Sequence, residues 1–200
     1  MKRFIIISLF TIFSAIFPVI GNAHFIKSNL ITSQHISIAD PLSKKDRTFF
    51  TALAYRESDN NPRKINKFGY IGKYQFGEEA LVALGYYHKD NTKKNDWKGQ
   101  WTGKDGIFSK EDFLNNSLIQ DKAVKELSLL NWQTARNNKL HHYIGQKISG
   151  ITITKAGIIA GMHLKGGKSV IDFITYKQNS YDAFGTGVKD YMHKFSIYHI

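Results

Sequence analysis

The sequence predicts a mainly α-helical α+β domain with one short β-hairpin after its first helix. Helix-capping signals precede several stretches in which apolar residues recur at helical spacing. Residues 68–77 are instead rich in aromatic residues and glycines, a pattern typical of a short, bent hairpin. The chain has no cysteine, which excludes a disulfide scaffold, a cysteine-ligated metal site and a thiol nucleophile.

Capping residues and glycines set the expected limits of the helices. A capping box at residues 43–46 opens the first helix, which runs to about Glu57. Ser109 opens a long helical stretch with a possible break at Asn115–Asn116, and a polar surface loop covers residues 89–104. The remaining expected helices are 78–84, stopped by Gly85; 110–138; 155–164, capped by Thr154 and ended by Gly166–Gly167; 170–176; and 187–195, capped by Thr186. Small residues at 157, 160 and 161 are expected to let their helix approach the first helix closely.

The first 23 residues have the features of a signal peptide. Two basic residues follow the first Met, residues 4–20 are uncharged and mostly apolar, and small residues precede a cleavage site after Ala23. We expect export and cleavage, and the rival interpretation is a retained membrane anchor. Residues 24–41 are polar and aperiodic and form an N-terminal arm, so residues 42–200 make up the folded domain. No other stretch is apolar enough to span a bilayer.

The chain is strongly basic. It has 28 Lys and Arg against 16 Asp and Glu, a formal net charge of +12. An exported, basic, cysteine-free chain suggests a monomer in the bacterial periplasm or outside the cell, with polyanionic partners such as wall polymers, peptide carboxylates or lipid headgroups. Nucleic acid, the usual partner of a basic protein, does not fit export. The alternative is that the charge only confers solubility.

Glu57 is the candidate catalytic residue. Phe49, Leu53 and Glu57 are spaced by four and therefore share one face of the first expected helix. The face that should pack into the core thus ends in a carboxylic acid, and a poorly hydrated carboxyl suits a general acid. The other interpretation is a frayed helix end with Glu57 in water. The turn at residues 58–62 and the aromatic hairpin that follows it favour the first interpretation.

The hairpin has the side chains of a sugar-binding surface. Tyr70, Tyr74 and Phe76 offer flat aromatic faces for sugar rings. Gln75 can reach hydroxyls or the acetamido group of an amino sugar. A carboxylic acid at a helix end that faces such a hairpin suits a polysaccharide groove.

Three stretches in the same order resemble the motifs of the lysozyme-like superfamily, in particular soluble lytic transglycosylases. Residues 55–61 resemble its Glu-Ser-x-x-Asn motif, and residues 69–75 resemble Gly-x-x-Gly-Leu-Met-Gln. Residues 156–163 are similar in position to Ala-Ala-Tyr-Asn-Ala-Gly, but Met162 and His163 stand where the Tyr-Asn pair is expected.

The resemblance implies a lysozyme-like fold. Residues 49–198 also resemble small lysozyme-like proteins found alone or with secretion and phage machinery, and the stretches that carry this likeness are 72–78, 101–106, 150–154 and 182–186. It implies cleavage of the β-1,4 bond between N-acetylmuramic acid and N-acetylglucosamine, with Glu57 protonating the glycosidic oxygen and with no cofactor or metal. His163 is expected either to bind substrate or to act as a hydrogen-bond donor behind the groove. The substrate-binding residues implied are Ser58, Asn61, Tyr70, Tyr74, Gln75, Phe76, Glu78 and His163.

Animal-type lysozymes have a second acid on the hairpin, at the position that Tyr70 occupies here. The expected enzyme is therefore a lytic transglycosylase, in which Glu57 acts as acid and then as base and leaves a 1,6-anhydro sugar. One alternative is a hydrolytic lysozyme with Glu78 as second acid, although Glu78 and Glu79 also suit a helix N-terminus. The other alternative is a non-catalytic module that binds wall glycan or a secretion apparatus.

Overall fold

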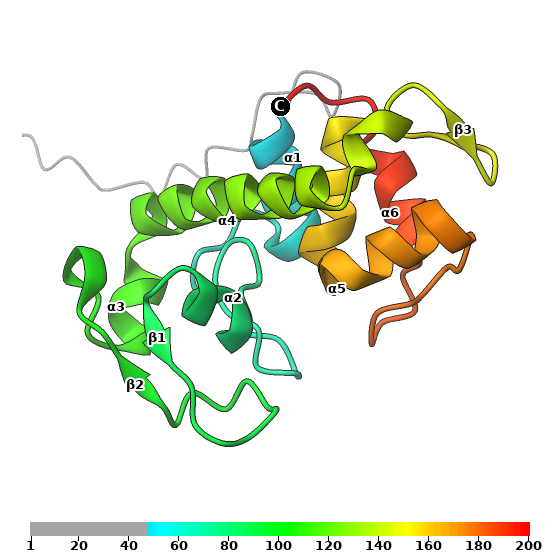
Figure 1. The fold of residues 1–200 in the computed structure, drawn as a ribbon. Helices are drawn as coiled ribbons and strands as arrows, with labels where there is room; N and C mark the ends of the chain where they lie inside the picture. The colour runs from blue at the N-terminus through cyan, green and yellow to red at the C-terminus, as the bar shows by residue number, and fades with distance from the viewer. Residues whose placement is uncertain (1–47) are drawn as a thin grey trace, which may run out of the picture. The chain divides into compact units, whose positions relative to one another are not determined.

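A computed structural model describes residues 48–200, which are mainly helical (Figure 1). This confirms the predicted class, α+β and mainly α. The longer helices are α1 (Phe49–Ser58), α4 (Ser117–Asn137), α5 (Lys155–Tyr176) and α6 (Val188–Phe195); the shorter ones are α2 (Glu78–Ala83), α3 (Lys110–Asn115) and the 3-10 helices η1 (Lys104–Gly106) and η2 (Leu140–Tyr143). Two antiparallel sheets pair β1 (Tyr87–His88) with β2 (Gln100–Trp101) and β3 (Lys147–Ile148) with β4 (Ile151–Thr152). The signal peptide, the arm and the capping box at residues 43–46 lie outside the described residues.

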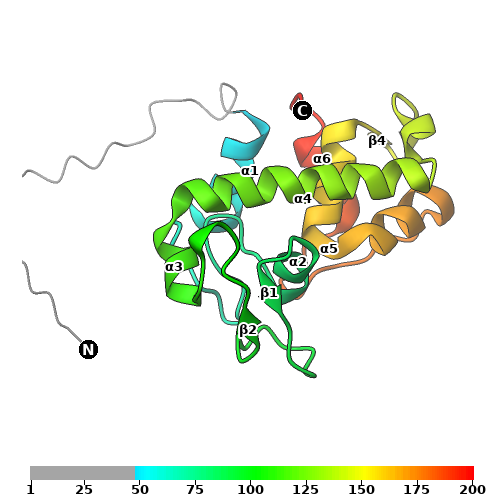
Figure 2. The same ribbon diagram turned by 60° about the vertical axis from the view of Figure 1, so that its left-hand side comes forward.

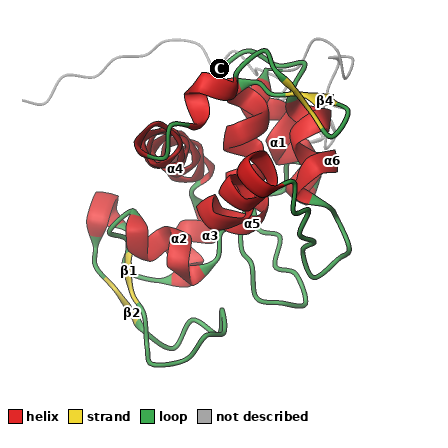
Figure 3. Cartoon of the chain, turned by 45° about the vertical axis from the view of Figure 1, so that its right-hand side comes forward, coloured by secondary structure: helices red, strands yellow, loops and turns green. Residues whose placement is uncertain are grey.

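Helix α5 is the centre of the packing, with α4 on one side and α6 on the other (Figures 2 and 3). At its small residues, α5 approaches α6 closely. A Cβ added to Gly161 would lie 2.7 Å from Met192 Cγ, and one added to Gly157 would lie 2.8 Å from the Met192 carbonyl oxygen. The expectation that Gly157 and Gly161 face the first helix is therefore wrong, because Met192 of α6 occupies the space beside both glycines. Ala160 instead belongs to the buried cluster that contains Phe49 and Leu53 of α1.

Helices α3 and α5 begin at their predicted capping residues, whereas α1 begins at Phe49 with Thr48 as its cap, later than predicted. The side chains of Ser109 and Thr154 accept hydrogen bonds from backbone amides in the first turns of α3 and α5. Asn116 separates α3 from α4 and caps α4, which confirms the predicted break. Thr186 does not cap α6, because the cap position is Gly187 and the Thr186 hydroxyl lies 3.5 Å from the Arg56 guanidinium.

Gly166 divides α5 into the two predicted helical segments. Its backbone angles, φ 78° and ψ 168°, lie outside the helical region. The helix therefore kinks directly after Leu164 and Lys165, and the predicted stop near Gly166 is confirmed as a change of direction. Among residues 48–200, no helix combines the length and the apolar character that crossing a membrane requires.

The expected hairpin at residues 68–77 is a tight loop in which Ile71 forms isolated antiparallel bridges with Phe76 and with Ile65. Ile71 and Phe76 exchange backbone hydrogen bonds of 2.9 and 2.8 Å. Gly72 and Gln75 both have positive φ, 81° and 51°, so the chain reverses too quickly for strands to form. The predicted polar loop 89–104 instead contains β2 and the start of η1, because Trp101 packs on the buried Tyr87.

Candidate functional site

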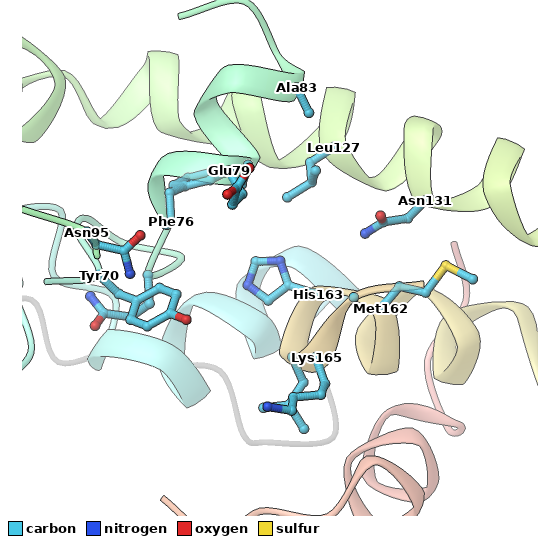
Figure 4. A pocket seen from close by; sticks show the side chains of 15 residues that line it. Tyr70, Phe76, Glu79, Ala83, Asn95, Leu127, Asn131, Met162, His163 and Lys165 are labelled. Atoms are coloured by element: carbon cyan, nitrogen blue, oxygen red, sulfur yellow. The ribbon is translucent and has the colours of Figure 1, made fainter. Parts of the chain in front are cut away.

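Glu57 lies in a groove between α1, the first half of α5 and two loops. The part around Glu57, here called the Glu57 chamber, measures about 150 Å³. The groove continues into a wider hollow of about 410 Å³ bordered by α2 and α4 (Figure 4). Both parts share Tyr70, Gln75, His163, Leu164 and Lys165. The chamber is lined by these five residues and by Glu57, Asn66, Phe68, Asp182, Ala183 and Phe184.

Glu57 is half-buried in the last turn of α1 and is held by Tyr191 of α6. The Tyr191 hydroxyl donates a hydrogen bond to Glu57 Oε1. Burial, and then the negative charge of Glu57, raise the pKa of Tyr191 well above its ordinary value. Tyr191 therefore stays protonated and remains a donor at neutral pH. Sequence reasoning gave Tyr191 no role, because nothing in its local sequence shows that α6 passes behind α1.

Ser58 and Asn61 connect α1 to the loop that follows it. Ser58 is buried; its hydroxyl donates to the Lys73 carbonyl oxygen at 2.7 Å and accepts from the Asn61 amide at 3.0 Å. The Asn61 side chain accepts from the Arg63 amide at 2.8 Å. Neither residue lines the groove, so their predicted substrate contacts are replaced by contacts that position Glu57.

The predicted hairpin residues separate into groove-lining and buried groups. Tyr70, 39% exposed, and Gln75 line both parts of the groove, and Phe76 lines the wider hollow with the edge of a buried ring. Tyr74 is buried and its hydroxyl donates to Asp121 at 2.6 Å. The prediction that Tyr74 stacks on a sugar is therefore wrong, because its ring faces α4.

Two residues of α4, which the sequence analysis did not select, hold this loop in place. The fully buried Gln120 accepts from the Lys73 amide at 2.6 Å and donates to the Phe113 carbonyl oxygen at 2.7 Å. Asp121 pairs with the Lys73 ammonium at 2.8 Å. A sequence signal existed for Gln120, since it lies one helical turn before the apolar Ala123 and Val124 and so shares their buried face.

His163 has the donor role that the sequence left open, and it also lines the groove. Its Nε2 lies 2.9 Å from the Tyr74 carbonyl oxygen, which can only accept, so Nε2 carries the hydrogen. In the neutral ring Nδ1 is then an acceptor. The side chain projects from α5 into the groove between Tyr70 and Leu127 (Figure 4). His163 therefore both fixes the loop and presents a polar ring to the groove.

Glu78 does not reach the groove. It is fully buried at the start of α2, and its Oε1 accepts from the Trp97 amide at 2.5 Å. Glu79 is exposed, lines the wider hollow and pairs with Lys89 at 2.5 Å. Glu78 therefore has no access to the Glu57 chamber, because its side chain turns toward the loop that carries Trp97. Its predicted substrate contact and its alternative role as second acid are both wrong.

The second carboxylate that lines the Glu57 chamber is Asp182, to which the sequence analysis gave no role. Its Oδ1 accepts from the backbone amides of Phe184 and Thr186, at 2.9 and 2.7 Å. This carboxylate therefore shapes the turn that forms one wall of the chamber.

Residues 48–200 contain no cluster of three His, Cys, Asp or Glu side chains that could hold a metal ion. Comparison of the chain with family models, curated proteins and solved structures found no match.

Proposed function

We propose that the chain is an exported lytic transglycosylase that cleaves the β-1,4 bond between N-acetylmuramic acid and N-acetylglucosamine in peptidoglycan. The observation that carries the proposal is the Glu57 carboxyl, half-buried in a groove and fixed by a hydrogen bond from Tyr191. A fixed acid in a groove with aromatic and amide side chains is the arrangement that general acid catalysis on a glycan needs.

In the proposed reaction, Glu57 gives its proton to the glycosidic oxygen as the bond to the anomeric carbon breaks. Since Tyr191 occupies Oε1, the proton is delivered from Oε2. The resulting carboxylate then takes the proton of the 6-hydroxyl as that oxygen bonds to the anomeric carbon. The intramolecular attack gains from the high effective concentration of the 6-hydroxyl, and one residue serves both steps.

A hydrolase is the second candidate, because Asp182 lines the same chamber as Glu57. In an inverting hydrolase a second carboxylate activates a water molecule, and in a retaining one it attacks the sugar. We place the transglycosylase first because Oδ1 of Asp182 already accepts two backbone hydrogen bonds, which gives this carboxylate a structural function.

The test is product analysis on purified sacculi. We expect 1,6-anhydromuramyl ends, identified by the loss of one water in their mass, and we expect Glu57→Gln to lower the rate about 10²–10⁴-fold. Asp182→Asn is the matched control, since an amide oxygen can keep both backbone hydrogen bonds, and it should retain the anhydro products. Reducing ends that disappear in Asp182→Asn would establish the hydrolase, and a folded protein that releases no product would refute both enzymes in favour of a glycan-binding module.

A further inference from the structure

A larger hollow, which the proposed reaction does not use, adjoins the Glu57 chamber. It measures about 660 Å³ and is bounded by residues 66–70, residues 93–96 and Ala183; we call it the lysine hollow. It shares Asn66, Phe68, Tyr70 and Ala183 with the chamber. A substituent on a sugar next to Glu57 therefore has to cross only this shared rim to enter the lysine hollow.

The lining of the lysine hollow is positively charged. It contains Lys67, Lys93 and Lys94 and a single acid, Asp96, whose carboxylate already lies 3.5 Å from the Lys98 ammonium. Within residues 48–200, neither Lys93 nor Lys94 forms an ion pair with a carboxylate. A concave surface lined by charges of one sign concentrates ligands of the opposite sign.

The two loops that form the lysine hollow are fixed to each other. The Trp97 indole donates to the Gly69 carbonyl oxygen at 2.7 Å, and the side-chain amide of Asn95 donates to the Phe68 carbonyl oxygen at 3.3 Å. The backbones touch, since a Cβ added to Gly69 would lie 2.0 Å from the Asn95 carbonyl oxygen. The hollow is therefore preformed, which reduces the entropy lost when a ligand binds.

We propose that the lysine hollow binds the carboxylates of peptide stems attached to the glycan strand in the groove. The substrate is then peptide-bearing peptidoglycan rather than stripped glycan. This inference rests on the proposed function, because the peptide branches from the muramic acid whose bond Glu57 breaks. A stem peptide supplies anionic groups on a short flexible chain, which fits a hollow of this volume beside the cleavage position.

The test measures binding separately from cleavage. In the Glu57→Gln background, Lys93→Gln/Lys94→Gln is compared with Lys125→Gln/Lys147→Gln, which removes two exposed lysines that line neither the groove nor the hollow. The probes are soluble glycan fragments with intact peptides and the same fragments stripped by an amidase, titrated by calorimetry at 0.15 M salt. The thermal midpoint of each variant confirms that it is folded.

We expect the peptide-bearing probe to bind more tightly than the stripped probe. The Lys93/Lys94 variant should bind the peptide-bearing probe roughly two- to thirty-fold more weakly, as expected for two exposed ion pairs. The Lys125/Lys147 variant should bind like its parent, and binding of the stripped probe should not change in either variant. Equal binding of the two probes would overturn the inference. Equal losses of affinity in the two lysine variants would also overturn it, because they indicate non-specific charge attraction.

Cleavage of sacculi by the wild-type protein is measured in parallel. Peptide- and lysine-dependent binding without cleavage would support the lysine hollow and refute the proposed enzyme. Cleavage without any dependence of binding on peptides would support the proposed enzyme and refute the lysine hollow. Stronger competition by inorganic polyphosphate than by free anionic peptide would assign the hollow to phosphate polymers and overturn the peptide assignment.

Discussion

Tyr191→Phe isolates the contribution of the hydrogen bond that holds Glu57. The substitution removes one oxygen and keeps the ring, which packs on Phe195 with centroids 4.9 Å apart. Hydrogen bonds to charged groups contribute about 1.5–3 kcal/mol. Because Glu57 is only half-buried, water can replace part of the lost bond, and we expect the free energy of unfolding to fall by about 1–2 kcal/mol.

The same substitution should lower kcat by about 10–100-fold and change KM little, because a small misplacement of a catalytic group is sufficient for a loss of that size. Rates on sacculi and urea unfolding at pH 7 measure the two effects. The decisive measurement is a double-mutant cycle with Glu57→Ala, which removes the acceptor, followed by unfolding, in which a coupling energy above about 0.5 kcal/mol is expected. Unfolding effects that simply add, together with an unchanged kcat, would show that Tyr191 does not position Glu57.

Three further predictions concern the surroundings of the groove. Glu78→Gln should keep the products and most of the rate, since the amide oxygen can still accept from the Trp97 amide, whereas Glu78→Ala should cost about 1–3 kcal/mol of stability by urea unfolding. Burial, followed by bonding to an aspartate, raises the pKa of both Tyr74 and Tyr86. Above about pH 10 the unfolded chain loses these phenol protons while the folded protein keeps them. The free energy of unfolding should therefore hold below that pH and then fall by up to about 1.4 kcal/mol per pH unit for each tyrosine. The decline should be shallower in Tyr86→Phe. Gly69→Ala places a methyl group against the neighbouring loop backbone and should lower the thermal midpoint and abolish the preference for peptide-bearing probes; an unchanged midpoint would show that the two loops are not in contact.

The sequence predicted local structure better than the contacts between distant segments. The Ser109 and Thr154 caps and the break at Asn116 are local signals and are confirmed. The place of Tyr74 was not predictable, because its partner Asp121 lies 47 residues away and belongs to a different element.

In the candidate site, too, local features were predictable and contacts between distant segments were not. Glu57 is at the end of its helix, as its spacing from Phe49 and Leu53 predicted. Tyr191, which contacts Glu57, and Asp182, which lines the same chamber, both come from the last quarter of the chain, where α5 and α6 pack together. The motif resemblance gave a role to the buried Ser58, which follows the acid in sequence, and gave none to Asp182 or Tyr191.

The kink at Gly166 has an electrostatic consequence for the groove. It ends the first segment of α5 directly after Leu164 and Lys165, which line the Glu57 chamber, while α1 ends one residue after Glu57. Two helix C-termini therefore converge on the chamber, and each carries a partial negative charge of roughly half an electron. Cleavage of a glycosidic bond passes through an oxocarbenium-like state in which the sugar ring becomes positive. Before any side chain acts, the backbone of this groove thus provides a field of the sign that such a ring requires, at roughly 0.3–1 kcal/mol for each helix.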